Sequence, residues 1–417
     1  MSSLINRAIE AIDEAATETV IFNAEKQVEI LQKARKRKRI TKTPKVLVNE
    51  DEVDDYDKID AIGHSTSLMF LVRSFGVKLY KKGWKNLNAV ERFMAELCLN
   101  SIVDLHDNQL MKAVGLDVQA IQDLQTKFMI SNLTCPNVDK EVQQLMKKAD
   151  KLSSLREKYN LHITTSLTFG GDIRKKIEIL AAVYKNFVFK KNDVKSWKTM
   201  SEWSIIIKLW VNIFEILFEE EDGISLVWGD TKNDQFKVDL RICLMLYSDK
   251  YDITNIEFKK NGGDIRATKE DAAKVLVEGK TILNSLSQYH NLNLQETKNI
   301  KVVVGQFCGL KGEFKQIRLV APGAYMVDKW GGTIKYPINE RMVDTFVDKL
   351  EQLFVFKDDI LKKAESLKGR LLEDDSPFGS QSTTEDQSFL KKTYYLSRKT
   401  KNFPKLNDDL FKVSPLV

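Results

Sequence analysis

The chain has 417 residues, which is too long for one ordinary domain, and its 65 Lys and Arg against 59 Asp and Glu leave a net charge of only +6. Apolar residues at 43% and charged residues at 30% indicate a soluble protein with enough material for a sizeable core. Only 19 Gly and 7 Pro exclude collagen-like and low-complexity classes and favour long helices.

The first 32 or so residues have helical periodicity, with Leu4, Ile5, Ala8 and Ile12 on one face. A helix this short can bury its apolar face only by packing against the body of the protein or against a neighbouring subunit. Between residues 33 and 45 there are eight basic residues and no acidic one, and between 50 and 60 seven acidic residues against one lysine. Neither run can bury apolar surface, so residues 1–60 are expected to form an arm followed by a charged linker.

The densest part of the basic run has three interpretations. It is a nuclear-import signal, an arm that contacts RNA, or a solvated linker. The acidic run that follows could compete with nucleic acid for it. The residues concerned are Arg35, Lys36, Arg37, Lys38 and Arg39.

The body is expected to be mainly α, with two helical lobes at 61–220 and 221–372 and minor β-hairpins in the C-terminal lobe. Alternating or β-branched segments predict short strands near residues 236–240, 301–305 and 317–320. The apolar stretch Trp203–Phe218 carries Lys208, Asn212 and Glu215 and therefore predicts a core helix, so no membrane partner is expected. Apolar periodicity predicts further helices at Leu87–Leu110, Val142–Tyr159, Ile173–Phe187, Glu270–Leu286 and Asn339–Leu367.

Residues 373–417 are expected to be a linker and a C-terminal arm. A polar stretch from Glu373 to Asp386 has loop composition. An apolar tail follows, and so many aromatic residues beyond a linker predict that the tail docks on a surface. Its apolar residues include Phe389, Leu390, Tyr394, Tyr395, Leu396, Phe403, Leu406, Leu410 and Phe411.

Motifs for catalysis or metal binding are missing from the sequence. There is no P-loop, no dinucleotide fingerprint, no H-E-x-x-H and no G-x-S-x-G, and Cys98, Cys135, Cys243 and Cys308 lack zinc-ligand spacing. Asp104, His106 and Asp107 could suggest an acid–base pair, but neighbours on a helix do not face one another, which favours a capping or surface histidine. No cofactor and no metal are expected.

A Gly-Gly-Asp-Ile-Arg motif occurs at 170–174 and again at 262–266. An enzymatic interpretation makes Asp172 and Asp264 ligands of a divalent metal in a nucleic-acid-processing site. The simpler interpretation, which the helical sequence after each motif favours, is a glycine turn followed by a helix cap.

Three clusters combine basic with aromatic residues, the composition that neutralises phosphates and stacks on unpaired bases. The alternative is that the lysines are solvated helix faces and that Phe187 and Phe189 belong to the core. The aromatic members include Tyr184 and Trp197 in the first cluster, Tyr80 and Trp84 in the second, and Tyr325, Trp330 and Tyr336 in the third. The candidate RNA contacts are Arg174, Lys175, Lys176, Lys185, Lys190 and Lys191 in the first cluster, Lys78, Lys81 and Lys82 in the second, and Lys311, Lys315 and Arg318 in the third.

Two helical lobes that carry basic and aromatic clusters, with an apolar arm at each end and no catalytic motif, form a layout that resembles the nucleoproteins of negative-strand RNA viruses. The stretches Val20-Ile21-Phe22-Asn23-Ala24-Glu25-Lys26-Gln27 and Ala34-Arg35-Lys36-Arg37-Lys38-Arg39-Ile40-Thr41-Lys42 resemble the start of an ophiovirus coat protein. The resemblance implies a nucleocapsid protein of the virion and the host cytoplasm, with nuclear passage through the basic run. It also implies RNA in a cleft between lobes, arms docked on neighbours, and a viral polymerase as partner.

The expected function is therefore that of a non-enzymatic capsid protein. It would coat single-stranded RNA without sequence specificity and form homo-oligomers by exchanging its terminal arms. The alternatives are the metal-dependent enzyme described above and a host scaffold protein that uses its helical lobes to bind protein partners.

Overall fold

The computed structural model describes residues 68–129, 133–189, 199–233, 236–247, 249–260, 265–374, 387, 389–391, 393 and 394. All of these residues belong to the compact unit formed by residues 62–417. The expected N-terminal arm, Arg35 to Arg39, Lys190, Lys191 and Asp264 lie outside the described residues.

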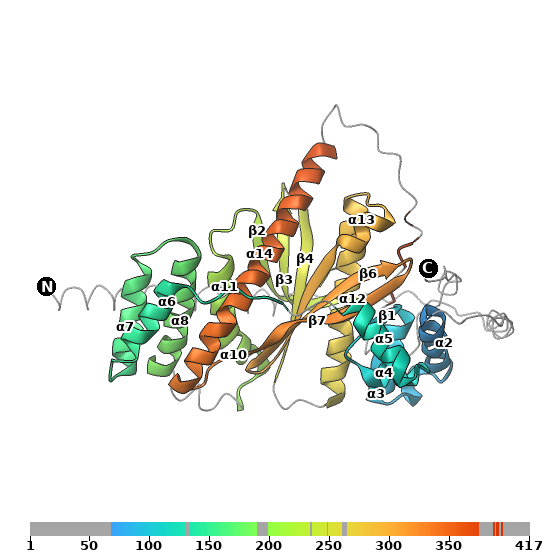
Figure 1. Cartoon of the computed structure of the whole chain (residues 1–417), viewed down its shortest axis with the longest axis horizontal. Coiled ribbons are helices and arrows are strands. Elements are labelled where there is room, and N and C mark those ends of the chain that lie inside the picture. The colour runs from blue at the N-terminus through green and yellow to red at the C-terminus, as the bar shows by residue number, and fades with distance from the viewer. Residues whose placement is uncertain are drawn as a thin grey trace, which may run out of the picture. The chain divides into compact units, whose positions relative to one another are not determined.

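A mixed sheet forms the centre of the described part of the chain (Figure 1). Its seven strands lie in the order β1-β7-β6-β5-β4-β3-β2. β1 runs parallel to β7 and β4 parallel to β5, while the other neighbours are antiparallel. The strands are β1 (Ile102–Asp104), β2 (Ile224–Asn233), β3 (Phe236–Leu246), β4 (Asp249–Lys259), β5 (Lys301–Cys308), β6 (Lys311–Ala321) and β7 (Ala324–Lys335).

The first helices come before β1 in the chain, and the next ones lie between β1 and β2. Capping boxes begin α3 at Asn88 and α7 at Ser154, because each side chain accepts from the third helical N–H while a glutamate returns to the cap. The elements up to residue 218 are α2 (Leu68–Lys81), η3 (Trp84–Asn86), α3 (Ala89–Leu99), α4 (Asn108–Ala113), α5 (Val118–Phe128), α6 (Lys140–Ala149), α7 (Leu155–Ser166), α8 (Gly171–Phe189), α10 (Glu202–Ile205), η5 (Ile206–Trp210) and α11 (Val211–Phe218).

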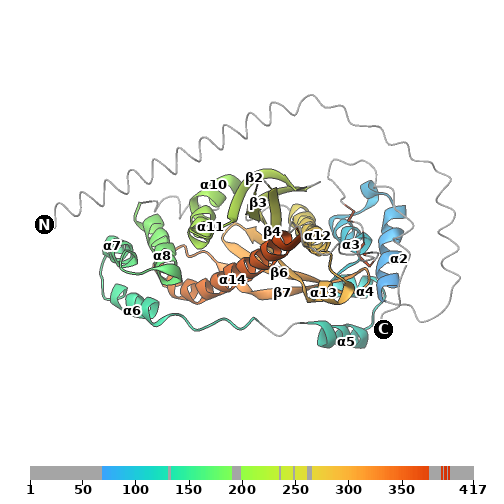
Figure 2. The ribbon, with the colours of Figure 1, turned by 90° about the horizontal axis from the view of Figure 1, so that it is seen from above.

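Two long helices, α12 (Ile265–Tyr289) and α14 (Val343–Asp374), cover the sheet, together with the short α13 (Leu294–Asn299) and η6 (Glu340–Met342). α12 packs closely because Gly279 has no side chain, and a Cβ there would lie 3.0 Å from both Val304 and Ile317. α14 meets the other side of β6, where the ring of Phe356 stacks on Phe314 with centroids 4.4 Å apart. Figure 2 shows α14 running obliquely along the strands.

The prediction of a mainly α fold with minor hairpins is wrong, because a seven-stranded mixed sheet organises the described chain. The expected helix 87–110 is interrupted by β1, which is only three residues long and pairs with Tyr325 to Val327 far along the chain. Local periodicity contains no trace of such a pairing. The expected helix 142–159 is divided by the capping box at Ser154.

Other predicted elements are confirmed. Helices occur where 173–187, 203–218, 270–286 and 339–367 were expected. The three predicted strand segments are also present, each within a longer strand. β1, from the expected N-terminal lobe, lies in the same sheet as the strands that follow residue 220.

Candidate docking groove and the basic clusters

The described residues of the stretch 387–394, here called the C-terminal segment, dock where α3, α12 and the β6–β7 turn meet, and this contact site is here called the docking groove. Among its described residues, Phe389 and Tyr394 are buried. Gln387 Nε2 donates to the carbonyl oxygens of Ser287 and Leu292 at 3.2 and 3.4 Å. The prediction that apolar residues of the tail dock on a surface is confirmed for these positions.

Asn100, fully buried at the end of α3, holds the far end of the segment. Its Nδ2 donates to the carbonyl oxygen of Tyr394 at 2.7 Å, and its Oδ1 accepts from the Tyr394 N–H at 2.8 Å. One side-chain amide thus satisfies both backbone groups of one residue, as a neighbouring strand would. The contact recognises the backbone and is independent of the tyrosine side chain.

A second amide holds the middle of the segment. Asn284 Nδ2 on α12 donates to the carbonyl oxygen of Lys391 at 3.1 Å, and the Lys391 N–H donates to the Tyr325 hydroxyl at 3.2 Å. The Tyr325 hydroxyl in turn donates to Asn284 Oδ1 at 2.8 Å. Burial raises the pKa of Tyr325, which keeps the hydroxyl protonated and able to donate.

The β6–β7 turn completes the groove at Gly323, whose N–H donates to the Phe389 carbonyl at 2.8 Å. Its φ of +66° suits glycine, and a Cβ would lie 2.7 Å from Lys391 Cγ and 2.8 Å from Arg73 Nη2. Arg73 is buried and donates to Gly323 O and Ser101 Oγ, both at 2.9 Å. Burial lowers the pKa of Arg73 to about 10, so it stays charged at neutral pH.

A second buried basic residue, Lys280 on α12, lies close to Tyr325 at the start of β7. Its Nζ is 4.9 Å from the centroid of the Tyr325 ring and 3.5 Å from Asn100 Oδ1. Burial and the charges of Arg73 and Lys391 lower the pKa of Lys280. The residues around the C-terminal segment therefore combine backbone-directed amides with the charged guanidinium of Arg73. Sequence patterns gave no signal for Asn100, Asn284, Arg73 or Lys280, because their roles depend on contacts between distant parts of the chain.

Asn100→Ala is expected to release the C-terminal segment, because both backbone groups of Tyr394 lose their partner in a buried position. Unpaired buried groups cost about 1–3 kcal/mol each. Limited trypsin digestion should therefore cut at Lys391 at least about tenfold faster than in the parent, since 1.4 kcal/mol corresponds to a factor of ten. Mass spectrometry identifies the cut. Asn86→Ala, which removes one exposed bond to Lys82 O, is the control, and an equal rate for both variants would contradict the assignment.

The first basic cluster begins at α8, where its cations are paired within the chain. Arg174 Nη2 lies 3.2 Å from Glu219 and 2.9 Å from Glu220. Lys175 Nζ is 2.6 Å from Glu221 and only 3% of the residue is exposed. Lys185 is half-buried, and Tyr184 and Phe187 are core residues, whereas Phe189 is 50% exposed.

Lys176 is the most enclosed member of that cluster. Its Nζ lies 2.5 Å from Asp139 Oδ2 and 2.7 Å from Glu351 Oε2, and the residue is 5% exposed. Burial alone would lower the pKa of Lys176, but hydrogen bonds to Asp139 and Glu351 raise it above its ordinary value. The ammonium is thus committed to contacts inside the chain.

The second and third clusters differ in accessibility. Lys78, Lys81 and Lys82 are exposed on α2 and just after it, with Lys82 also paired to Glu91 at 3.0 Å. Trp84 beside them is buried under the Arg92 guanidinium, 5.0 Å from the ring centroid.

On β6, Lys311 is exposed and Lys315 pairs with Asp104 at 2.5 Å. Arg318 donates to the carbonyl oxygen of Phe128. Tyr325, Trp330 and Tyr336 are buried. α8 and α2 lie toward opposite ends of the described part of the chain in both ribbon views, so the described members of the clusters do not gather in one place (Figures 1 and 2).

The residues considered for acid–base chemistry or metal binding also have partners within the chain. His106 Nε2 lies 2.6 Å from Asp328 Oδ1 on β7, a residue that the sequence did not single out, while Asp107 caps α4. Asp172 lies in the first turn of α8, next to Gly171 with φ +57°, and pairs with Lys357. In the described ranges, no three His, Cys, Asp or Glu side chains gather in a way that could hold a metal ion.

No helix in the described part of the chain combines the length and apolarity needed to cross a bilayer. Comparison of the sequence with protein-family models gives no match, and comparisons with curated proteins and with solved structures give none either.

Proposed function

We propose that this protein is a non-enzymatic coat protein that binds single-stranded RNA without sequence preference and assembles into homo-oligomers along it. The observation that carries the proposal is the C-terminal segment, which is held through its backbone in a groove built from α3, α12 and the β6–β7 turn. A segment bound in this way beyond a polar stretch suits exchange between identical subunits.

The proposal requires that the chain between α14 and the C-terminal segment can lead either to the groove of its own subunit or to that of an adjacent copy. Fully extended, residues 375–386 could span up to roughly 40 Å, since each residue reaches about 3.3 Å. The same groove can therefore take the segment of its own chain or that of an adjacent copy. When RNA holds two copies side by side, the adjacent segment is present at high effective concentration, which makes coating cooperative.

The RNA-binding part of the proposal depends on those members of the three clusters that are exposed in the described chain. These are Lys78, Lys81 and Lys82 of the second cluster, and Lys311 on β6. The basic run from Arg35 to Arg39 supplies five further charges in a short stretch. Arg174, Lys175 and Lys176 are the weakest candidates for phosphate contacts, because carboxylates already surround them.

Replacing Lys78, Lys81 and Lys82 with alanine should weaken binding to a poly-uridine strand and flatten its salt dependence. Each lost phosphate contact removes about 0.7 from the slope of log K against log salt, so the slope should fall by about 2. Fluorescence titration at several salt concentrations measures it. The matched control replaces the exposed Lys140, Lys147 and Lys148 of α6, and equal slopes for both triple variants would contradict this RNA surface.

Assembly is tested separately, by removing residues 387–417. The truncated protein should stay folded and bind RNA with the affinity of a single subunit, but it should form no filaments or rings in electron micrographs. The ratio of absorbance at 260 and 280 nm reports bound RNA in the same samples. Assemblies of normal length from the truncated chain would contradict exchange of the C-terminal segment.

A further inference from the structure

The strand β2 lies at one edge of the sheet, and β3 is the only strand paired with it among the described residues. The other edge, β1, is three residues long and buried throughout. β2 extends from Ile224 to Asn233, and its residues 224–228 are half-exposed. The described chain therefore presents one long strand edge.

The first half of this edge, residues 224–228, lacks the usual protection against pairing, which begins only with the bulge and the charged Asp230 and Lys232 that follow. The stretch Ile-Ser-Leu-Val-Trp at 224–228 contains no charge and no proline, and the bulge in β2 comes only after it, between Trp228 and Thr231. Protein sheets normally protect edge strands with charges, proline or bulges, because free N–H and C=O groups accept another strand. An edge left open in this way is typical of a surface that pairs with a partner.

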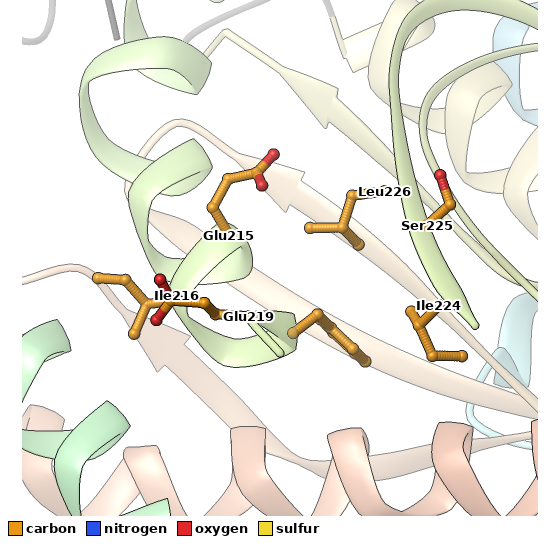
Figure 3. Close-up of a pocket in the computed structure, with 7 residues that line it drawn as sticks. Glu215, Ile216, Glu219, Ile224, Ser225 and Leu226 are labelled. Atoms are coloured by element: carbon orange, nitrogen blue, oxygen red, sulfur yellow. The ribbon is translucent and has the colours of Figure 1, made fainter. Parts of the chain in front are cut away.

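An open cleft of about 380 Å³ runs beside this edge, between β2 and α11. Figure 3 shows Leu226 of β2 and Glu215 of α11 on its facing walls, with Ile224 further along the strand. The lining combines apolar side chains from both walls with two carboxylates from the α11 side. The lining residues are Glu215, Ile216, Phe218, Glu219, Ile224, Ser225 and Leu226.

The charge around the cleft is negative. Glu215 is exposed and accepts from Trp228 Nε1 at 2.5 Å, which holds the carboxylate beside the strand. The side chains of Glu219 and Glu220 are 51% and 67% exposed and share one cation, Arg174. Asp222 is exposed as well. The exposed carboxylates beside the cleft therefore outnumber the Arg174 guanidinium, which pairs with two of them.

We propose that the β2 edge binds an extended segment of a protein partner, which adds a strand to the sheet and places lysine or arginine side chains in the cleft. The methylene stems of such side chains can cover Ile224 and Leu226, and their charged ends can reach Glu215 and Glu219. Apolar β-branched residues at the alternate positions suit the pleat of the added strand. None of the residues that line this cleft belongs to the docking groove or to the exposed lysines proposed for RNA binding.

The probe is a capped peptide of about eight residues that alternates lysine with valine, and the comparison peptide replaces lysine with glutamate. The lysine peptide should bind the full-length protein at least about tenfold more tightly, as measured by fluorescence anisotropy. Binding should also slow amide hydrogen exchange in 224–228. Equal binding of the two peptides, or binding without protection of these amides, would overturn the proposal.

Two variants locate the site on the protein. The double replacement Glu215→Gln and Glu219→Gln should weaken binding of the lysine peptide about tenfold, and Leu226→Lys should abolish it by placing a like charge on the edge. Asp123→Asn, an exposed carboxylate on α5, is the matched control and should leave the affinity unchanged. Circular dichroism shows whether each variant is folded, and folded cleft variants with the parent affinity would refute the site.

Discussion

Replacing Lys176 with methionine should lower the free energy of unfolding by about 3–5 kcal/mol, the usual cost of removing one partner of a buried ion pair. The Lys176 ammonium lies 2.7 Å from Glu351 Oε2, and both side chains are at least 93% buried, with exposures of 7% and 3%. Without the lysine, the Glu351 carboxylate stays enclosed with no cation. Urea unfolding followed by tryptophan fluorescence measures the change.

A second substitution distinguishes the ion pair from general packing. When Lys176→Met is combined with Glu351→Leu, most of the lost stability should return, because buried pairs replaced by apolar residues of similar size are often neutral. Lys78→Met, on the exposed face of α2, should change stability by no more than about 0.5 kcal/mol. If Lys176→Met unfolds at the parent urea concentration, the buried pair makes no net contribution.

The same residue shows what sequence patterns can and cannot provide. A lysine among aromatic residues was a reasonable candidate for RNA contact, but whether its charge is available depends on Asp139 and Glu351, which approach only in the folded chain. By contrast, the docking of Phe389 and Tyr394 was predictable, because apolar residues beyond a polar linker need a surface to cover them. The tendency of an apolar residue to be buried can be inferred from the sequence around it, whereas the neutralisation of a lysine charge depends on tertiary contacts.

The sheet was missed for a related reason. Long amphipathic helices such as α12 and α14 repeat their pattern many times, and the sequence predicts them well. β4 carries charged residues on a mostly buried strand, and one of them, Glu257, pairs with Lys274 of α12 at 2.6 Å. Such a compensated charge breaks the alternation expected of a strand. The mixed topology follows from pairings such as β1 with β7 that no local window contains.

Where α12 packs on the sheet, buried carboxyl groups outnumber the lysine that pairs with them. Glu278 of α12 is 1% exposed, and its Oε1 lies 3.5 Å from Lys274 Nζ. The same lysine also pairs with Glu257 of β4, and Asp239 of β3 lies in the same electrostatic environment. Burial raises the pKa of Glu278 to about 7 and that of Asp239 to about 6. At neutral pH the cluster is therefore part-way through its titration.

Glu278→Gln should accordingly stabilise the protein at alkaline pH. Because the folded state binds the proton of Glu278 more tightly than the unfolded state, its stabilising contribution is complete below about pH 4.5 and is lost as the pH rises through 7. Glutamine keeps the shape without the charge. The free energy of unfolding of the variant relative to the parent should therefore rise by up to about 3 kcal/mol between pH 4.5 and 8.

Glu157→Gln provides a control of opposite sign. Hydrogen bonds from Ser154 lower the pKa of Glu157 in the folded state, so its carboxylate stabilises the protein above the unfolded pKa. Relative to the parent, this variant should become less stable as the pH rises, whereas Glu278→Gln becomes more stable. Urea unfolding at a series of pH values gives both difference curves. A flat curve for Glu278→Gln would mean that the α12 carboxylate has the same proton affinity in the folded and unfolded chain, and that its burial is compensated by water or by local opening of α12.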